Sequence, residues 1–136
     1  MVVMMSFTSG WQTNFAKAKE EAKNNHKYIL LTFTGSDWCP HCMLTKEKIF
    51  DTRSFSAFAD SDLVLVNADF PQQAKNKLSA AQAKENEALA AIYDKSGSYP
   101  VIILFNENGI KVKEWVGYPN ISAEKFVKQI RSFEHH

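Results

Sequence analysis

The chain has few cysteines, no long apolar run and almost no net charge, and each absence narrows what it can be. Its 136 residues include only two cysteines, Cys39 and Cys42, so disulfides cannot staple a scaffold of this size and stability must come from an apolar core. The longest apolar runs, such as 28–31 and 101–105, are far shorter than the roughly 20 residues that cross a bilayer. We therefore expect no membrane span.

The chain also has no large excess of charge of one sign. Sixteen Lys and Arg residues stand against fifteen Asp and Glu residues, which leaves a formal net charge of +1, and the two signs are interspersed. Such a surface has no strong positive electrostatic potential to attract nucleic acid or an anionic membrane, so we expect no nucleic-acid partner. A chain of 136 residues that is 45% hydrophobic can bury one core and is too short for a second, which predicts a single domain over 1–136.

The two ends of the chain are set apart from this domain. We interpret the first ten residues as an N-terminal extension, in which Met1 to Met5 are apolar but lack the basic flank and longer apolar core of a signal peptide. His135 and His136 close the chain and are interpreted as the remnant of a purification tag rather than as metal ligands. Two histidines, His26 and His41, remain for chemistry.

The hydrophobic pattern alternates amphipathic helices with buried strands. We expect, in order, a helix from Trp11 to about Asn25, a strand over Tyr28 to Thr34, a helix from Pro40, a short helix carrying Phe55 and Phe58, a strand over Leu63 to Phe70, a helix over 71–93 with a solvated first half, a hairpin of 101–105 and 110–116, and a closing helix capped by Ser122. This order mixes parallel crossovers with one antiparallel hairpin and predicts an α/β fold.

One short motif carries the chemistry: Cys39-Pro40-His41-Cys42, at the start of the second predicted helix. Two cysteines three positions apart lie on one face of a helix, within reach of a reversible disulfide. Cys39 falls at the exposed N-terminus of that helix, where free backbone N–H groups and the helix dipole favour a thiolate. Cys39 is therefore the candidate nucleophile.

Cys42 lies one turn further into the same helix. It is followed by Met43 and Leu44, which we place with Ile49 on the apolar side of the helix. A shielded thiol at this position is suited to attack a mixed disulfide and release the substrate. The pair needs no bound cofactor beyond its own disulfide.

His41 stands between the two cysteines and can stabilise negative charge on Cys39, which makes a pair more oxidising. A Cys-x-x-Cys pair can also bind metal. Structural zinc needs two further Cys or His ligands, and only His26 and His41 remain, which disfavours it. Two thiolates alone suit copper(I), so a metallochaperone stays open, as does a peptide-binding module whose cysteines do not turn over.

The segment Phe33-Thr34-Gly35-Ser36-Asp37-Trp38-Cys39-Pro40-His41-Cys42 resembles the active-site strand and helix of thioredoxin-like proteins, in particular bacterial thioredoxin-related proteins of the Gly-Ser-Asp-Trp-Cys type. The resemblance runs from about Trp11 to Phe133. It implies a thioredoxin fold, with a central mixed sheet of four to five strands flanked by helices on both faces. It also implies a thiol-disulfide oxidoreductase that acts on protein thiols and disulfides, in a direction that the motif leaves open.

A second motif lies far from the first in the sequence. Tyr99-Pro100, just before the strand at 101–105, matches the family's cis-proline. By that resemblance Tyr99 and Pro100 present backbone to an extended substrate peptide, and Trp38 flanks the site. The relatives are often exported, which points to the periplasm, although a lone catalytic pair works on either side of a membrane. We expect a monomer served by a redox partner that the sequence does not identify.

Two features depart from the family. The Pro-His dipeptide is that of the periplasmic disulfide-introducing oxidase, but the segment 71–86 is too small for the helical insertion of that protein. Typical thioredoxins also carry an acidic residue in the strand before the motif, where this chain places Phe33, and Asp37 lies closer to the cysteines. Water or Asp37 is then the candidate acceptor for the proton of the second cysteine.

Overall fold

The structure, a computed structural model, describes residues 10–134, so the expectations for Met1 to Met5, His135 and His136 lie outside it. The strands are β1 (Trp11–Gln12), β2 (Tyr28–Thr34), β3 (Leu63–Asp69), β4 (Val101–Phe105) and β5 (Lys111–Val116). The helices are α1 (Phe15–Asn25), α2 (Pro40–Thr45), α3 (Arg53–Asp62), α4 (Ala80–Tyr93) and α5 (Ala123–Glu134), with a π-helical turn η1 (Lys46–Phe50) and a 3-10 turn η2 (Ala74–Asn76). In this part of the chain, no helix is long and apolar enough to cross a membrane.

The five strands form one mixed sheet in the order β1-β3-β2-β4-β5. β1, β3 and β2 run parallel, whereas β4 is antiparallel to both β2 and β5. This confirms the predicted α/β fold with one antiparallel hairpin. β2, which leads into the cysteine motif, is paired on both sides and lies at the centre of the sheet.

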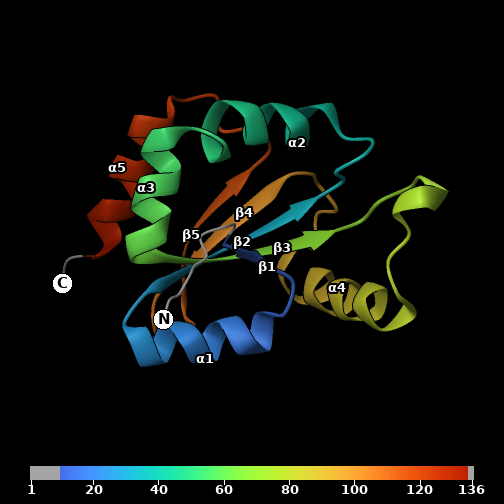
Figure 1. The fold of residues 1–136 in the computed structure, drawn as a ribbon, viewed down its shortest axis with the longest axis horizontal. Helices are drawn as coiled ribbons and strands as arrows, with labels where there is room; N and C mark the ends of the chain where they lie inside the picture. The colour runs from blue at the N-terminus through green and yellow to red at the C-terminus, as the bar shows by residue number, and fades with distance from the viewer. Residues whose placement is uncertain (1–9, 135–136) are drawn as a thin grey trace, which may run out of the picture.

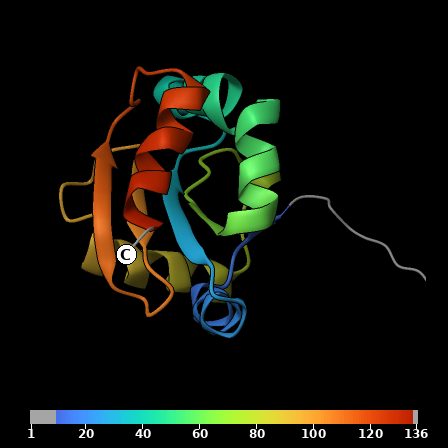
Figure 2. The same ribbon diagram turned by 90° about the vertical axis from the view of Figure 1, so that its left-hand side faces the viewer.

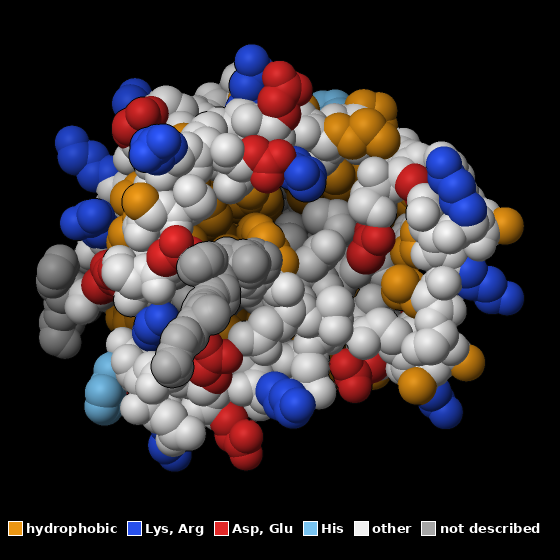
Figure 3. Space-filling model, in the orientation of Figure 1, with side chains coloured by type: hydrophobic (Ala, Val, Ile, Leu, Met, Phe, Trp, Pro, Cys, Tyr) orange, Lys and Arg blue, Asp and Glu red, His pale blue; other side chains and the backbone are white. Residues whose placement is uncertain are grey.

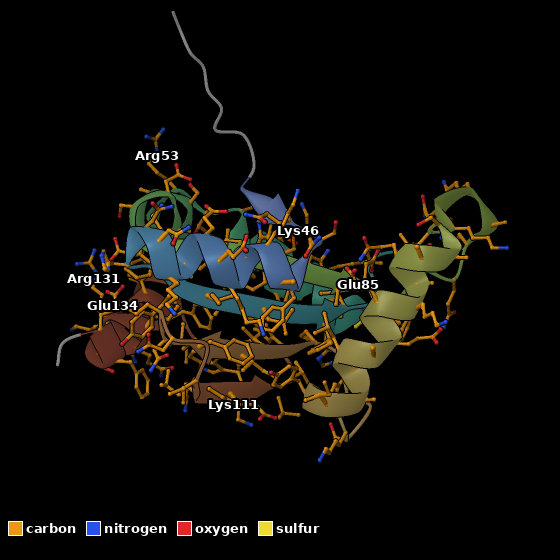
Figure 4. All side chains as sticks on the ribbon, turned by 90° about the horizontal axis from the view of Figure 1, so that it is seen from below. Lys46, Arg53, Glu85, Lys111, Arg131 and Glu134 are labelled. Atoms are coloured by element: carbon orange, nitrogen blue, oxygen red, sulfur yellow. The ribbon has the colours of Figure 1, made fainter. Side chains whose placement is uncertain are left out.

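Helices cover both faces of the sheet, as predicted (Figure 1). α1 and α4 pack on one face, and α2, η1, α3 and α5 pack on the other (Figure 1). Figure 2 shows α3 and α5 side by side, with α1 on the far side of the sheet. Seen from below, Arg131 and Glu134 at the end of α5 lie at the opposite end of the molecule from α4 (Figure 4).

Side chains of β2 alternate between the two cores, and this alternation decides what lies under the motif. Phe33 is fully buried in the core that contains Phe15 of α1. Leu30, Thr32 and Thr34 project to the other face, since they lie an odd number of positions from Phe33. Residue 33 therefore points away from α2, and Thr32 occupies the place beneath the motif where the resemblance led us to expect Phe33.

The first helix starts later than the sequence indicated. Trp11 was predicted to be helical, but it lies in β1 and pairs with Leu65 of β3. α1 begins only at Phe15, because the Asn14 side chain accepts a hydrogen bond from the backbone N–H of Lys17 and so caps the helix. A strand of two residues is too short to show an alternating pattern.

The predicted helix over 71–93 is also shorter. α4 begins at Ala80, where the Ser79 hydroxyl accepts from the backbone N–H of Gln82 at 3.1 Å. The preceding residues, 71–79, form a loop that contains only the short turn η2. The solvated first half of the predicted helix is therefore a loop.

The buried stripe of the motif helix differs from the predicted one. Met43 was placed on the apolar side, but it is 46% exposed, and Leu44 is half-buried. Cys42, Thr45 and Ile49 form the buried stripe, at intervals of three and four. A threonine thus takes the position beside the sheet that the apolar pattern gave to Met43.

The turn that joins β2 to α2 depends on a glycine. The carbonyl of Gly35 accepts from the backbone N–H groups of Trp38 and Cys39 at 3.2 and 2.9 Å. The Trp38 ring lies directly on Gly35, so that a Cβ built there would be 2.2 Å from the ring atom Cε2. The indole Nε1 donates to the carbonyl of Phe70 at 2.7 Å. The indole is therefore fixed in a position that any larger residue at 35 would obstruct.

We predict that Gly35→Ala lowers the free energy of unfolding by about 1–3 kcal/mol, because the new methyl group overpacks against the Trp38 ring. In a Trp38→Ala background the same substitution should cost close to nothing, since the obstructing ring is gone. Denaturant unfolding of the four proteins of this cycle measures the coupling. An equal cost of Gly35→Ala in both backgrounds would contradict the packing described here.

Candidate active site

Cys39 is the N-cap residue of α2. Its Sγ accepts a hydrogen bond from the backbone N–H of Cys42 at 3.2 Å, and Pro40 occupies the first turn of the helix. The predicted exposure of Cys39 is wrong, because only 4% of the residue is exposed. The carbonyl of Tyr99 lies 3.8 Å from the sulfur and covers it from the β4 side. The sulfur thus lies at a helix N-terminus but is buried, with the Tyr99 backbone beside it.

Cys42 lies deeper in the same turn and is 5% exposed, as its predicted shielding requires. Its Sγ accepts from the backbone N–H of Gly35 at 3.5 Å. The pKa of the Cys42 thiol is raised to about 12, mainly by burial and then by the hydrogen bond to Cys39 and the charges of Cys39 and Asp69, while the hydrogen bond from Gly35 acts in the opposite direction. Both thiols are free, and Cys42 holds its proton across the neutral range.

His41 is exposed in the first turn of α2. Its carbonyl accepts from the Thr45 hydroxyl at 2.7 Å. Its imidazole makes no hydrogen bond or ion pair with any residue of 10–134. Any effect of this ring on the Cys39 sulfur therefore acts through space and through solvent.

Three aromatic side chains stand beside the cysteines. The Tyr99 ring contacts the edge of Trp38 at 5.3 Å between centroids and that of Phe70 at 5.6 Å. The Tyr99-Pro100 bond is cis, as the resemblance implied, and Pro100 lines the same pocket as Cys42. The structure thus brings together the two motifs that the sequence separates. Phe70 was predicted as the last residue of a strand and not as part of the site, whereas in the structure it follows β3, which ends at Asp69.

Asp37 does not face the cysteines. Its carboxylate accepts from the backbone N–H groups of Gln72 and Gln73 at 2.9 and 3.0 Å, and from the Asn76 amide at 2.9 Å. The Asn76 hydrogen bond, followed by that from Gln72, holds the pKa of Asp37 below its usual value. The proposed role of Asp37 as a proton acceptor is not supported, because it holds the 71–79 loop instead.

Asp69, at the end of β3, is the acidic residue that sequence reasoning missed. Its carboxylate accepts from the backbone N–H of Ser36 at 2.8 Å and from the Ser36 hydroxyl. It also accepts from the Thr34 hydroxyl at 3.3 Å. These hydrogen bonds hold the turn before the motif, and they occupy the Asp69 carboxylate as an acceptor.

The described residues contain no group of three or more His, Cys, Asp or Glu side chains placed to hold a metal ion. Two thiols in one helical turn are what the site offers to a soft metal.

Comparison with known proteins agrees with this geometry. Residues 15–134 match the model of the thioredoxin-like domain. The chain is 33% identical over 122 residues to the disulfide bond reductase DsbH of Chlamydia pneumoniae, which covers 90% of this chain and 70% of that protein. It is 29% identical to the thiol:disulfide interchange protein DsbD of Campylobacter jejuni over 86% of its own length, but it spans only 18% of that protein.

Solved structures give the same result. A structure of a DsbH oxidoreductase superposes with a TM-score of 0.79 at 29% identity, covering 97% of this chain and 92% of the other. A thioredoxin from Thermus thermophilus superposes with a TM-score of 0.67 at 15% identity, covering 90% and 84% of the two chains, and supports the fold alone. The chain belongs to the thioredoxin-like family, as a thiol-disulfide oxidoreductase with a Cys39–Cys42 pair.

Proposed function

We propose that this protein is a single-domain reductase of protein disulfides, a bacterial thioredoxin-related protein of the Gly-Ser-Asp-Trp-Cys type that works outside the cytoplasm as a monomer. The observation that carries the proposal is the inequality of the two thiols. The Cys39 sulfur accepts the N-cap hydrogen bond at 3.2 Å, whereas the pKa of Cys42 is raised to about 12. Reaction therefore begins at Cys39.

The catalytic cycle follows from this inequality. The Cys39 thiolate attacks one sulfur of a substrate disulfide, and the other substrate sulfur leaves as a thiolate that takes up a proton. Cys42 then loses its proton and attacks the Cys39 sulfur of the mixed disulfide. The Cys39–Cys42 disulfide forms and the second substrate thiol is released, so the substrate is reduced and the protein pair is oxidised. A redox partner of the thiol class must then restore the pair.

Burial of Cys42 supports the reducing direction. A pair becomes a strong oxidant when its reduced form is stabilised. Here the Cys42 thiolate is disfavoured by burial, and the hydrogen bonds that the two sulfurs accept within residues 10–134 come from the backbone N–H groups of Cys42 and Gly35. The reduced form gains little, which favours the disulfide and hence donation of electrons to a substrate. The name of the DsbH relative, a disulfide bond reductase, agrees with this direction.

The surroundings of Cys39 suit an extended peptide. The Tyr99 carbonyl, 3.8 Å from the sulfur, and Pro100 present backbone where a substrate strand would pair. The indole N–H of Trp38 already donates to the carbonyl of Phe70, so the substrate can contact the Trp38 ring but cannot accept a hydrogen bond from it. We assign Trp38, Tyr99 and Pro100 to substrate contact.

The proposal predicts that the reduced protein accelerates reduction of insulin by a small dithiol and that Cys39→Ser abolishes this activity. A glutathione titration should place the pair between about −270 and −200 mV, the range of reducing and mildly oxidising relatives, rather than near about −120 mV. Wild-type insulin reduction no faster than that of Cys39→Ser would reject the function. A potential near about −120 mV would reject the direction and leave an oxidase.

We also predict that His41→Pro makes the pair more reducing. The His41 ring, two positions after Cys39, can stabilise the thiolate of the reduced form through space, and its loss favours the disulfide. The potential from the same titration should become more negative. His26→Ala removes an imidazole at the end of α1, which pairs with Glu107 at 3.2 Å, and serves as the control with an unchanged potential. An unchanged or less negative potential in His41→Pro would contradict the assigned role.

A further inference from the structure

A hollow of about 470 Å³ lies between the 71–79 loop and α4. Its lining includes the apolar side chains of Phe70 and Leu78, together with Gln72, Lys77 and Glu87. Figure 3 shows both basic and apolar side chains on the right-hand part of the molecule, where Figure 1 places α4 and the loop before it. Apolar carbon, an amide and charges of both signs suit a stretch of polypeptide better than an anion or a lipid tail.

Phe70 connects this hollow to the candidate active site. Its ring contacts the Tyr99 ring at 5.6 Å between centroids, and its carbonyl accepts from the indole N–H of Trp38 at 2.7 Å. The Tyr99 carbonyl in turn lies 3.8 Å from the Cys39 sulfur. An extended chain advances about 3.3 Å per residue, so a substrate bound at Tyr99 reaches the hollow within a few residues of its own cysteine.

The 71–79 loop is held in one position although it adds nothing to the core. Residues 72–77 are all exposed, and η2 contains no buried residue. Ordering such a loop costs conformational entropy, and burial of its own apolar side chains does not offset this cost. Loops that are ordered without a share in the core are commonly binding elements. The function of this loop is therefore to be sought at the hollow that it lines.

Asp37, two positions before Cys39, makes four hydrogen bonds that hold this loop. Its carboxylate accepts from the backbone N–H groups of Gln72 and Gln73 at 2.9 and 3.0 Å and from the Asn76 amide at 2.9 Å. Its carbonyl accepts from the Gln73 side-chain amide at 3.2 Å. One residue of the active-site turn thus fixes the loop side of the hollow.

The opposite side of the hollow is also fixed. Asn86 of α4 is only 2% exposed, and its amide donates to the carbonyl of Asp69 at 3.0 Å. Its side-chain oxygen accepts from Gln82 at 2.9 Å, and Gln82 also donates to the carbonyl of Thr13 at 3.1 Å. These contacts tie the first half of α4 to the sheet. Both walls stand in place before a substrate arrives, which lowers the entropic cost of binding.

We propose that the hollow between the 71–79 loop and α4 is a substrate subsite, which binds the part of a substrate protein that flanks its reacting cysteine. Asp37 is a positioning residue, because it holds one wall of this subsite and its hydrogen bonds go to the loop rather than to the sulfurs. The subsite favours protein disulfides over small disulfides, since a small disulfide has no chain to place there. The inference rests on the reductase activity proposed above for Cys39.

Steady-state kinetics with a long and a short substrate test this subsite. Insulin supplies a protein disulfide, and dithiobis-nitrobenzoate reacts with Cys39 without any flanking chain. We expect Asp37→Ala to raise the KM for insulin about tenfold and to leave kcat within about twofold of the wild type, because the wall is lost while the sulfurs are unchanged. The rate with dithiobis-nitrobenzoate should also stay within about twofold. Hydrogen exchange at the backbone amides of Gln72 and Gln73 should become faster.

A variant on the loop side checks that the effect comes from the wall. Asn76→Ala removes one of the Asp37 contacts and should raise the insulin KM in the same direction but by less. The double variant should be no worse than Asp37→Ala alone, since both changes break the same contact. Asn76→Ala also carries the test if Asp37→Ala folds poorly.

Asp51→Ala is the matched control, because it removes another exposed carboxylate, one that pairs with Lys46 at 2.8 Å and not with the loop. Its insulin KM should equal that of the wild type. An insulin KM within about twofold of the wild type in both Asp37→Ala and Asn76→Ala, or an equal loss of activity with both substrates, would overturn the inference. Wild-type insulin reduction no faster than that of Cys39→Ser would instead reject the proposed function, and the subsite with it.

Discussion

The backbone N–H of Cys42 donates to the sulfur of Cys39 at 3.2 Å, and the chemistry of the site depends on this contact. It stabilises negative charge on one sulfur, and the same turn buries the other. Negative charge on Cys39 in turn raises the pKa of Cys42, so that the thiols cannot ionise together. Two identical side chains three positions apart thereby acquire different roles.

The order of the proposed catalytic steps follows from this coupling. When Cys39 enters a mixed disulfide, its charge and its capacity to accept from the Cys42 thiol both disappear. Two of the causes that raise the pKa of Cys42 are then removed, and burial and the charge of Asp69 remain. In the proposed cycle the first step thus prepares the second.

Much of this site could be predicted from the sequence, for physical reasons. The spacing of Cys39 and Cys42 places them on a common face of any helix. The Tyr99-Pro100 motif can be recognised from the sequence alone. The rest depends on contacts between strands. Asp69, at the end of β3, accepts a hydrogen bond from Ser36 in the turn after β2, and such a contact leaves no periodic signal. The position of Thr32 beneath the motif was not predicted, because threonine is a common residue in apolar strands and only the structure shows on which face of the sheet it lies.

The most direct test of the account is the rate of alkylation of each thiol in the reduced protein, followed by peptide mass spectrometry from neutral to strongly alkaline pH. Because the pKa of Cys42 is raised to about 12, iodoacetamide should modify Cys39 alone in the neutral range. Cys42 should become reactive only near the alkaline end, and earlier in a Cys39→Ser variant. Alkylation of Cys42 as fast as Cys39 at neutral pH would contradict the central claim.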